Sequence, residues 1–127
     1  MSYIIQKKKV SDNMKFDINR VKIFVTVPID STDKVRDAAC KKGAGVIGNY
    51  SYCTTSYKVI GTFIPNDGAN PYIGSNNQLE IVEEEKIEFV CDIRNAKDVI
   101  KEIRRVHPYE EPAIDIVPLI DEKDLLK

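Results

Sequence analysis

Residues 107–113, which read His-Pro-Tyr-Glu-Glu-Pro-Ala, hold the densest set of chemically useful side chains in the sequence. An imidazole, a phenol and two carboxylates lie between two prolines, whose rings restrict the backbone. A third carboxylate follows on the next expected strand. Such groups can bind a polar ligand, or a divalent cation through nitrogen and oxygen. The predicted ligand-binding residues are His107, Tyr109, Glu110, Glu111 and Asp115. The predicted metal ligands are His107, Glu110 and Glu111.

A structural role for His107 is the alternative. The imidazole continues the apolar stripe of the preceding helix one turn beyond Ile103, where it can satisfy a hydrogen bond in the core. His107 is also the only histidine in the chain, which excludes sites built from several imidazoles, including most catalytic zinc sites. Because one imidazole without a second nitrogen or sulfur ligand makes a weak metal site, we favour the structural role.

Residues 43–48, Gly-Ala-Gly-Val-Ile-Gly, match the G-x-G-x-x-G pattern of dinucleotide-binding proteins. That fingerprint requires a strand before the glycines and a helix after them, so that the pyrophosphate meets a helix N-terminus. Here a helix is expected before the glycines and a strand after them. The acidic residue expected about 20 positions later is absent too. We therefore interpret the segment as a helix-to-strand turn.

Three further features have both a functional and a structural interpretation. The turn-forming segment 65–77 is longer than a hairpin requires, and it suits ligand binding and contact with a neighbouring subunit equally. Residues 83–85, three successive glutamates, can form an acidic site, but a solvated strand end is favoured. Cys53 can act as a nucleophile only with a base beside it, and His107 is the only histidine available. We favour a packing role for Cys53.

Composition excludes several classes of protein. Of the 127 residues, 19 are Lys or Arg and 20 are Asp or Glu, giving a net charge of −1. This balance offers no electrostatic case for binding nucleic acid or a membrane surface. With 43% hydrophobic and 31% charged residues, the chain is typical of one globular domain. The three cysteines form no C-x-x-C pair, and the N-terminus does not read as a signal peptide, so we expect a cytoplasmic protein with reduced thiols.

The elements that must position these residues follow the order β-α-β-β-α-β. Strands are expected over residues 21–27, 50–63, 81–93 and 113–119, with a bulge at Gly61. The first helix begins near residues 30–33 and stops at Gly43; the second is capped by Asp92 or Asn95 and ends at Pro108. This order predicts a ferredoxin-like α+β fold, an antiparallel sheet with two helices on one face. The expected division is an extension over 1–20, a domain over 21–120 and a tail over 121–127.

Several blocks of the sequence, in the same order, resemble the PII-like domain that is inserted in Nif-three (hexameric dinuclear-metal) proteins. The blocks are residues 43–50 with Cys53, residues 61–65, residues 68–74, Glu80 with residues 83–85, and residues 107–113. His107 to Glu110, with Pro112, also resemble the corresponding segment of the CutA divalent-cation-tolerance family. The resemblance implies a PII/CutA-like fold, a tendency to trimerise and a cleft near residues 107–111. The histidine-rich metal centre of full Nif-three proteins cannot be carried over, because this chain has one histidine.

The sequence therefore leads to three hypotheses. The first is a non-catalytic, trimeric PII/CutA-like binding or regulatory protein that takes a divalent metal ion or a small ligand near residues 107–113. The second is a structural partner that acts in trans with a Nif-three core protein. The third is an enzyme that uses Cys53 or His107. None of them involves nucleic acid or a membrane, and the sequence identifies no cofactor beyond the candidate divalent metal ion.

Overall fold

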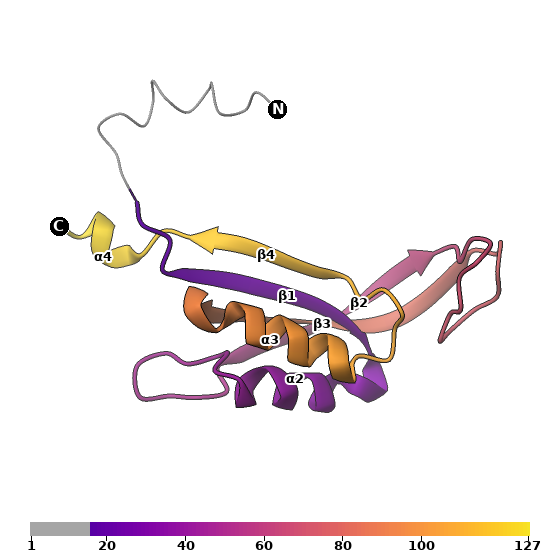
Figure 1. Cartoon of the computed structure of the whole chain (residues 1–127), viewed down its shortest axis with the longest axis horizontal. Coiled ribbons are helices and arrows are strands. Elements are labelled where there is room, and N and C mark those ends of the chain that lie inside the picture. The colour runs from indigo at the N-terminus through magenta and orange to yellow at the C-terminus, as the bar shows by residue number, and fades with distance from the viewer. Residues whose placement is uncertain (1–15) are drawn as a thin grey trace, which may run out of the picture.

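Four strands form one antiparallel sheet in the computed structural model, which describes residues 16–127. The strands are β1 (Arg20–Pro28), β2 (Thr54–Phe63), β3 (Glu80–Asp92) and β4 (Ile114–Leu119), in the spatial order β2-β3-β1-β4. Helices α2 (Thr32–Lys41) and α3 (Ile93–Val106) lie on one face of this sheet (Figure 1). A 3₁₀ turn, η1 (Ile29–Ser31), precedes α2, and a short helix, α4 (Glu122–Leu125), follows β4. The predicted ferredoxin-like fold is confirmed, while most of the predicted extension, residues 1–20, lies outside the described residues.

The core lies between the sheet and the two helices. Alternate residues of β1 and β3 point into it, because successive side chains of a strand face opposite sides. From the sheet come Val21, Ile23, Val25, Val27, Ile87, Phe89 and Cys91; from the helices come Val35, Ala39, Ala96, Val99 and Ile103. The period-two pattern predicted for the first strand is confirmed: its core-facing residues are at most 3% exposed. Within the described part of the chain, no helix covers the opposite face of the sheet (Figure 1).

The β2–β3 hairpin extends past the helices at one end of the molecule (Figure 1). Its pairing runs without interruption from Thr54 opposite Phe89 to Phe63 opposite Glu80. The predicted bulge at Gly61 is therefore wrong, since Gly61 pairs regularly with Val82. Gly61 instead leaves space for the side chain of Glu84 on the neighbouring strand.

The segment between α2 and β2 is a loop, and the strand predicted from residue 50 begins only at Thr54. Gly43 and Gly45 have φ angles of +107° and +73°, a left-handed region that residues with a side chain rarely adopt. The backbone of Gly45 donates to Val90 O at 2.8 Å and accepts from Cys53 N at 2.8 Å. These bonds fold the glycine-rich segment back onto β3, so its interpretation as a helix-to-strand turn is confirmed.

Local chemistry sets the ends of α3. The Asp92 carboxylate accepts from the backbone N–H of Arg94 at 2.9 Å. Of the two predicted caps, Asp92 and Asn95, it is therefore Asp92 that caps the helix. Ile93, predicted at the end of a strand, is instead the first residue of the helix. The helix ends at Val106, just before His107 and Pro108, as predicted. Within residues 16–127, no helix is long and apolar enough to cross a membrane.

Candidate functional site

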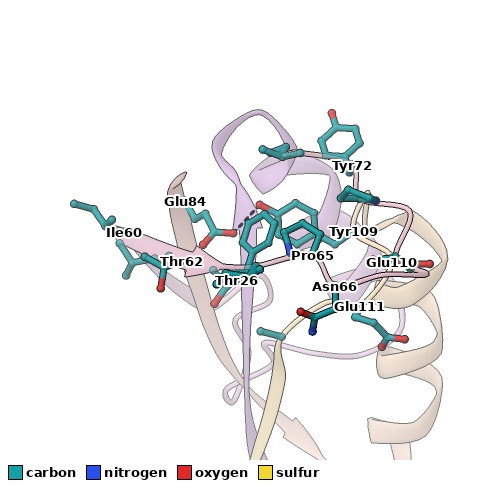
Figure 2. A pocket seen from close by; sticks show the side chains of 18 of the residues that line it. Thr26, Ile60, Thr62, Pro65, Asn66, Tyr72, Glu84, Tyr109, Glu110 and Glu111 are labelled. Carbon is teal, nitrogen blue, oxygen red and sulfur yellow. Dashed lines mark hydrogen bonds between the residues drawn. The ribbon is translucent and has the colours of Figure 1, made fainter. Parts of the chain in front are cut away.

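A cavity of about 620 Å³ lies at the far end of the β2–β3 hairpin. Thr26 and Lys86, which pair across β1 and β3, contribute to its floor. Their sequence neighbours Val25 and Ile87 are buried in the core, so Thr26 and Lys86 point to the sheet face without helices. Parts of the hairpin loop and of residues 109–113 form the walls. The cavity is thus built by segments far apart in sequence (Figure 2).

Glu84 is the buried charged group of this cavity. It is 5% exposed, and its Oε2 accepts a hydrogen bond from the Tyr109 hydroxyl at 2.7 Å (Figure 2). Its Oε1 accepts no hydrogen bond from residues 16–127. Every fully buried side-chain oxygen in that part of the chain has a hydrogen-bond partner. Oε1 has none, so it is not fully buried, and it is reached from the cavity that Glu84 lines. A Cβ on Gly61 would overlap Oε1, so a glycine stands at that position to make room for the carboxylate.

Tyr109 lies at the centre of an aromatic cluster. Its ring centroid is 6.3 Å from that of Phe63 and 6.2 Å from that of Tyr72, both in tilted arrangements. Burial, and then the hydrogen bond to Glu84, raise the pKa of the Tyr109 hydroxyl well above its usual value. Tyr109 therefore stays neutral and serves as the hydrogen-bond donor to the carboxylate.

His107 lies behind Tyr109 and holds it in place. The imidazole is 7% exposed, and its Nε2 lies 2.8 Å from Thr26 O. Because a carbonyl oxygen only accepts, Nε2 carries the proton, and Nδ1 accepts from the backbone N–H of Tyr109 at 3.1 Å. Burial lowers the pKa of His107, which favours this neutral form. Both ring nitrogens are engaged within the protein, and a metal ion at either one would have to displace a hydrogen bond.

Of the other predicted site residues, Glu110 and Glu111 line the cavity and Asp115 does not. Glu110 lines the cavity, and its carboxylate accepts from the backbone N–H of Asn70 at 3.0 Å, tying the hairpin loop to the segment after α3. Glu111 lines the rim and pairs with Arg104 at 3.5 Å. Asp115 lies on β4 opposite Phe24; it is exposed and is not among the residues that line the cavity.

The structure thus gathers Tyr109, Glu110 and Glu111 at the cavity, with His107 behind them and Asp115 apart. Residues 16–127 contain no group of three or more His, Cys, Asp or Glu side chains that could hold a metal ion. Metal binding by His107, Glu110 and Glu111 accordingly stays a prediction without a preformed cluster in the described part of the chain.

Glu84 is the residue that sequence reasoning missed. The interpretation of residues 83–85 as a solvated strand end is wrong for Glu84, which is 95% buried. Its burial follows from the walls that the hairpin loop and residues 109–113 place around it. The signal in the sequence is Gly61, whose absent side chain leaves space for a cross-strand neighbour. That signal can be read only once the register of β2 against β3 is known.

The structure does not bring Cys53 and His107 together as a nucleophile and its base. The imidazole of His107 is hydrogen-bonded to Thr26 O on β1. Thr26 pairs with Lys86 on β3, and Lys86 pairs with Tyr57 on β2. Cys53 precedes Tyr57 by four residues, about 13 Å along the strand, far beyond hydrogen-bond reach.

Comparisons with known proteins agree with this architecture. No protein-family model matches the sequence. The chain is 49% identical over 105 residues to a GTP cyclohydrolase 1 type 2 homolog of Halalkalibacterium halodurans, covering 83% of this chain and 28% of that protein. It is 45% identical over 98 residues to the protein of the same name from Bacillus subtilis, covering 77% and 26%. The chain therefore spans about a quarter of the length of the curated relatives it matches.

Solved structures extend the likeness. A Bacillus cereus protein related to NIF3 superimposes with a TM-score of 0.72 at 40% identity, covering 84% of this chain and 27% of that chain. CutA1 from the psychrotrophic bacterium Shewanella sp. SIB1 superimposes with a TM-score of 0.62 at 18% identity, covering 84% of this chain and 86% of that chain. The chain is similar in sequence to one part of NIF3-related proteins and shares its fold with a CutA protein over nearly the full length of each.

Proposed function

We propose that this chain is a non-catalytic, trimeric, PII/CutA-like binding or regulatory protein that takes a small ligand in the cavity beside Glu84 and Tyr109. The observation that carries the proposal is the buried carboxylate with one oxygen open to a cavity of about 620 Å³, a volume within the usual range for small-molecule sites. Of the 20 residues that line the cavity, 12 are apolar or aromatic and eight are polar or charged, so apolar walls predominate as they do in small-molecule sites.

The likeness to one part of NIF3-related proteins supports a PII-like domain of their kind over residues 21–120. We also propose a cytoplasmic location, which the three free cysteines support because thiols stay reduced there.

Trimer formation is supported by apolar surface that residues 16–127 leave exposed. Ile60, Ile81, Leu79 and Ile64, at the end of the hairpin, are 73%, 66%, 60% and 50% exposed. The outer strands β2 and β4 also present open sheet edges, which proteins usually cover. Light scattering at low micromolar concentration tests this. Three chains of 14.4 kDa give about 43 kDa, whereas a monomer alone would refute the trimer.

Native mass spectrometry combined with elemental analysis of the purified protein tests the ligand. A small organic molecule retained by the folded protein supports the cavity proposal. The competing candidate, a divalent metal ion, predicts one ion per subunit that is lost in His107→Ala and kept in Asp115→Ala. Asp115 is the matched control because it is a carboxylate of the same predicted site that does not line the cavity. If the metal is found with this pattern of loss and retention, the ligand of the cavity is a divalent ion and not an organic molecule.

A second candidate function is a structural partner that acts in trans with a Nif-three core protein. The observation that favours it is the likeness to one part of a relative, at 49% identity over 105 residues. Co-purification of this chain with a core protein at a fixed stoichiometry would support this role. Retention of the core protein by a variant with Ile60→Glu and Ile81→Glu would place the contact elsewhere.

A further inference from the structure

We propose that the ligand of this cavity is a protonated organic amine, an ammonium or guanidinium group on an apolar or aromatic body. The inference rests on the proposed function, because it names the chemical class of the ligand that binds at the same cavity. Three independent features of the cavity carry it: an uncompensated carboxylate, a set of aromatic faces and the sign of the surrounding charge.

The first feature is the carboxylate of Glu84. Its one hydrogen-bond partner, the Tyr109 hydroxyl, is neutral, and no Lys, Arg or His nitrogen of residues 16–127 lies within 4.0 Å of it. A charge that is 95% buried without a counter-charge is costly. A ligand N–H group donating to Oε1 would supply both the counter-charge and the missing hydrogen bond. Charge-assisted bonds of this kind are the stronger ones.

The second feature is the aromatic wall. The rings of Phe63, Tyr72 and Tyr109 line the same cavity as Glu84, with Tyr109 between the other two. Aromatic faces attract cations through the negative charge of their π-systems, and this attraction grows when water is excluded. Rings beside a buried carboxylate suit an organic cation better than a hydrated metal ion, because the rings offer no ligand atoms for a metal.

The third feature is the charge of the lining. Four carboxylates and one lysine line the cavity: Asp67, Glu84, Glu110, Glu111 and Lys86. Each of the four carboxylates accepts one hydrogen bond, from Asn77, Asn70, Arg104 or Tyr109. Glu84 differs from the other three in being buried. An anionic ligand drawn to Lys86 would have to place its charge near Glu84, two residues away on the same face of β3. The balance favours a cation.

Isothermal titration calorimetry with three probes of one shape tests the inference on the full chain. The probes are phenethylamine, which is cationic at pH 7, neutral 2-phenylethanol and anionic 3-phenylpropionate. We expect the amine to bind about tenfold or more tightly than the other two, the difference expected of a hydrogen bond to a charged group. In Glu84→Gln this preference disappears, because glutamine still accepts from Tyr109 but carries no charge.

Two further variants keep the test decisive. In Glu83→Gln, which neutralises an exposed carboxylate on the other face of β3 that does not line the cavity, the amine keeps its affinity. In Tyr72→Leu, which alters an exposed ring on the rim, the amine loses more affinity than the alcohol does. The chemical class is overturned if the alcohol or the acid binds as well as the amine, or if Glu84→Gln leaves the preference intact. If none of the probes binds, both the class and the proposed ligand site are refuted.

Discussion

Replacing Tyr109 by phenylalanine isolates the hydrogen bond on which the buried carboxylate depends. The substitution keeps the ring against Phe63 and Tyr72 and removes only the hydroxyl that donates to Glu84 at 2.7 Å. The carboxylate, 5% exposed, then has no hydrogen-bond donor among residues 16–127. We therefore expect Tyr109→Phe to destabilise the fold.

The magnitude follows from the charge and burial of the pair. A hydrogen bond to a charged group contributes about 1.5–3 kcal/mol, and a buried carboxylate left without its donor loses at least that much. Glu84 Oε1 faces the cavity, so water entering there offsets part of the loss and keeps the cost near the lower half of this range. We expect the free energy of unfolding to fall by about 2 kcal/mol, equivalent to roughly 7 °C in melting temperature for a chain of this length.

Urea unfolding followed by circular dichroism measures this loss, at one fixed protein concentration because association would shift the midpoint. Tyr72→Phe is the matched control. Tyr72 is 56% exposed and its hydroxyl makes no hydrogen bond with residues 16–127, so this change costs about 0.5 kcal/mol or less. If Tyr109→Phe costs no more than Tyr72→Phe, the bond to Glu84 contributes no measurable stability and the reasoning fails.

Three other predictions rest on the same structure. Gly61→Ala should lower the free energy of unfolding by about 1–3 kcal/mol, because the added Cβ displaces the Glu84 carboxylate. Urea unfolding should show a smaller loss when the same substitution is made in Glu84→Ala, and equal losses in the two backgrounds would contradict this. The lowered pKa of His107 means that its contribution to stability is present above the unfolded-state value of about 6.5 and is lost as pH falls through the lower folded-state pKa. Unfolding free energies from pH 8 to pH 5 should therefore fall more steeply in the wild type than in His107→Gln, and parallel curves would refute it. Cys91 is 2% exposed and burial raises its pKa to about 11, so iodoacetamide at pH 8 should leave it unmodified until urea unfolds the protein; peptide mapping that finds early alkylation there would exclude the buried thiol.

Much of the fold was predictable because local patterns and tertiary structure agree. Alternation over residues 21–27 predicted a strand, and the same alternation buries Val25 and Val27 against the helices. Asp92 and Pro108 marked the ends of α3 because capping and proline chemistry act over a few residues. The start of β2 was predicted four residues early. A run rich in tyrosine and threonine favours a strand. The preceding residues are held in a loop because Gly45 N–H donates to Val90 O and Gly45 O accepts from Cys53 N–H.

The candidate site was predictable only in part, because the sequence shows which side chains lie close together along the chain but not which of them face the cavity. Residues 107–113 drew attention because their side chains can do chemistry, and the structure places Tyr109 and Glu110 at the cavity. His107 and Asp115 belonged to the same prediction, yet His107 lies behind Tyr109 and Asp115 does not line the cavity. The distinction depends on how the segment crosses the end of the sheet, which spacing along the chain does not encode.

The three successive glutamates show most clearly why register decides chemistry. A strand turns alternate side chains to opposite faces, so a run of three charges cannot share one environment. Glu83 is exposed, Glu85 accepts from the Thr32 hydroxyl at 2.6 Å on the helix side, and Glu84 is buried on the cavity side. A shift of one residue in the pairing of β3 would exchange these roles. It would bring a different side chain against Gly61 and separate the carboxylate from Tyr109. The binding chemistry proposed for this chain is therefore a property of the register between β2 and β3, and variants that disturb that register should abolish amine binding before they unfold the core.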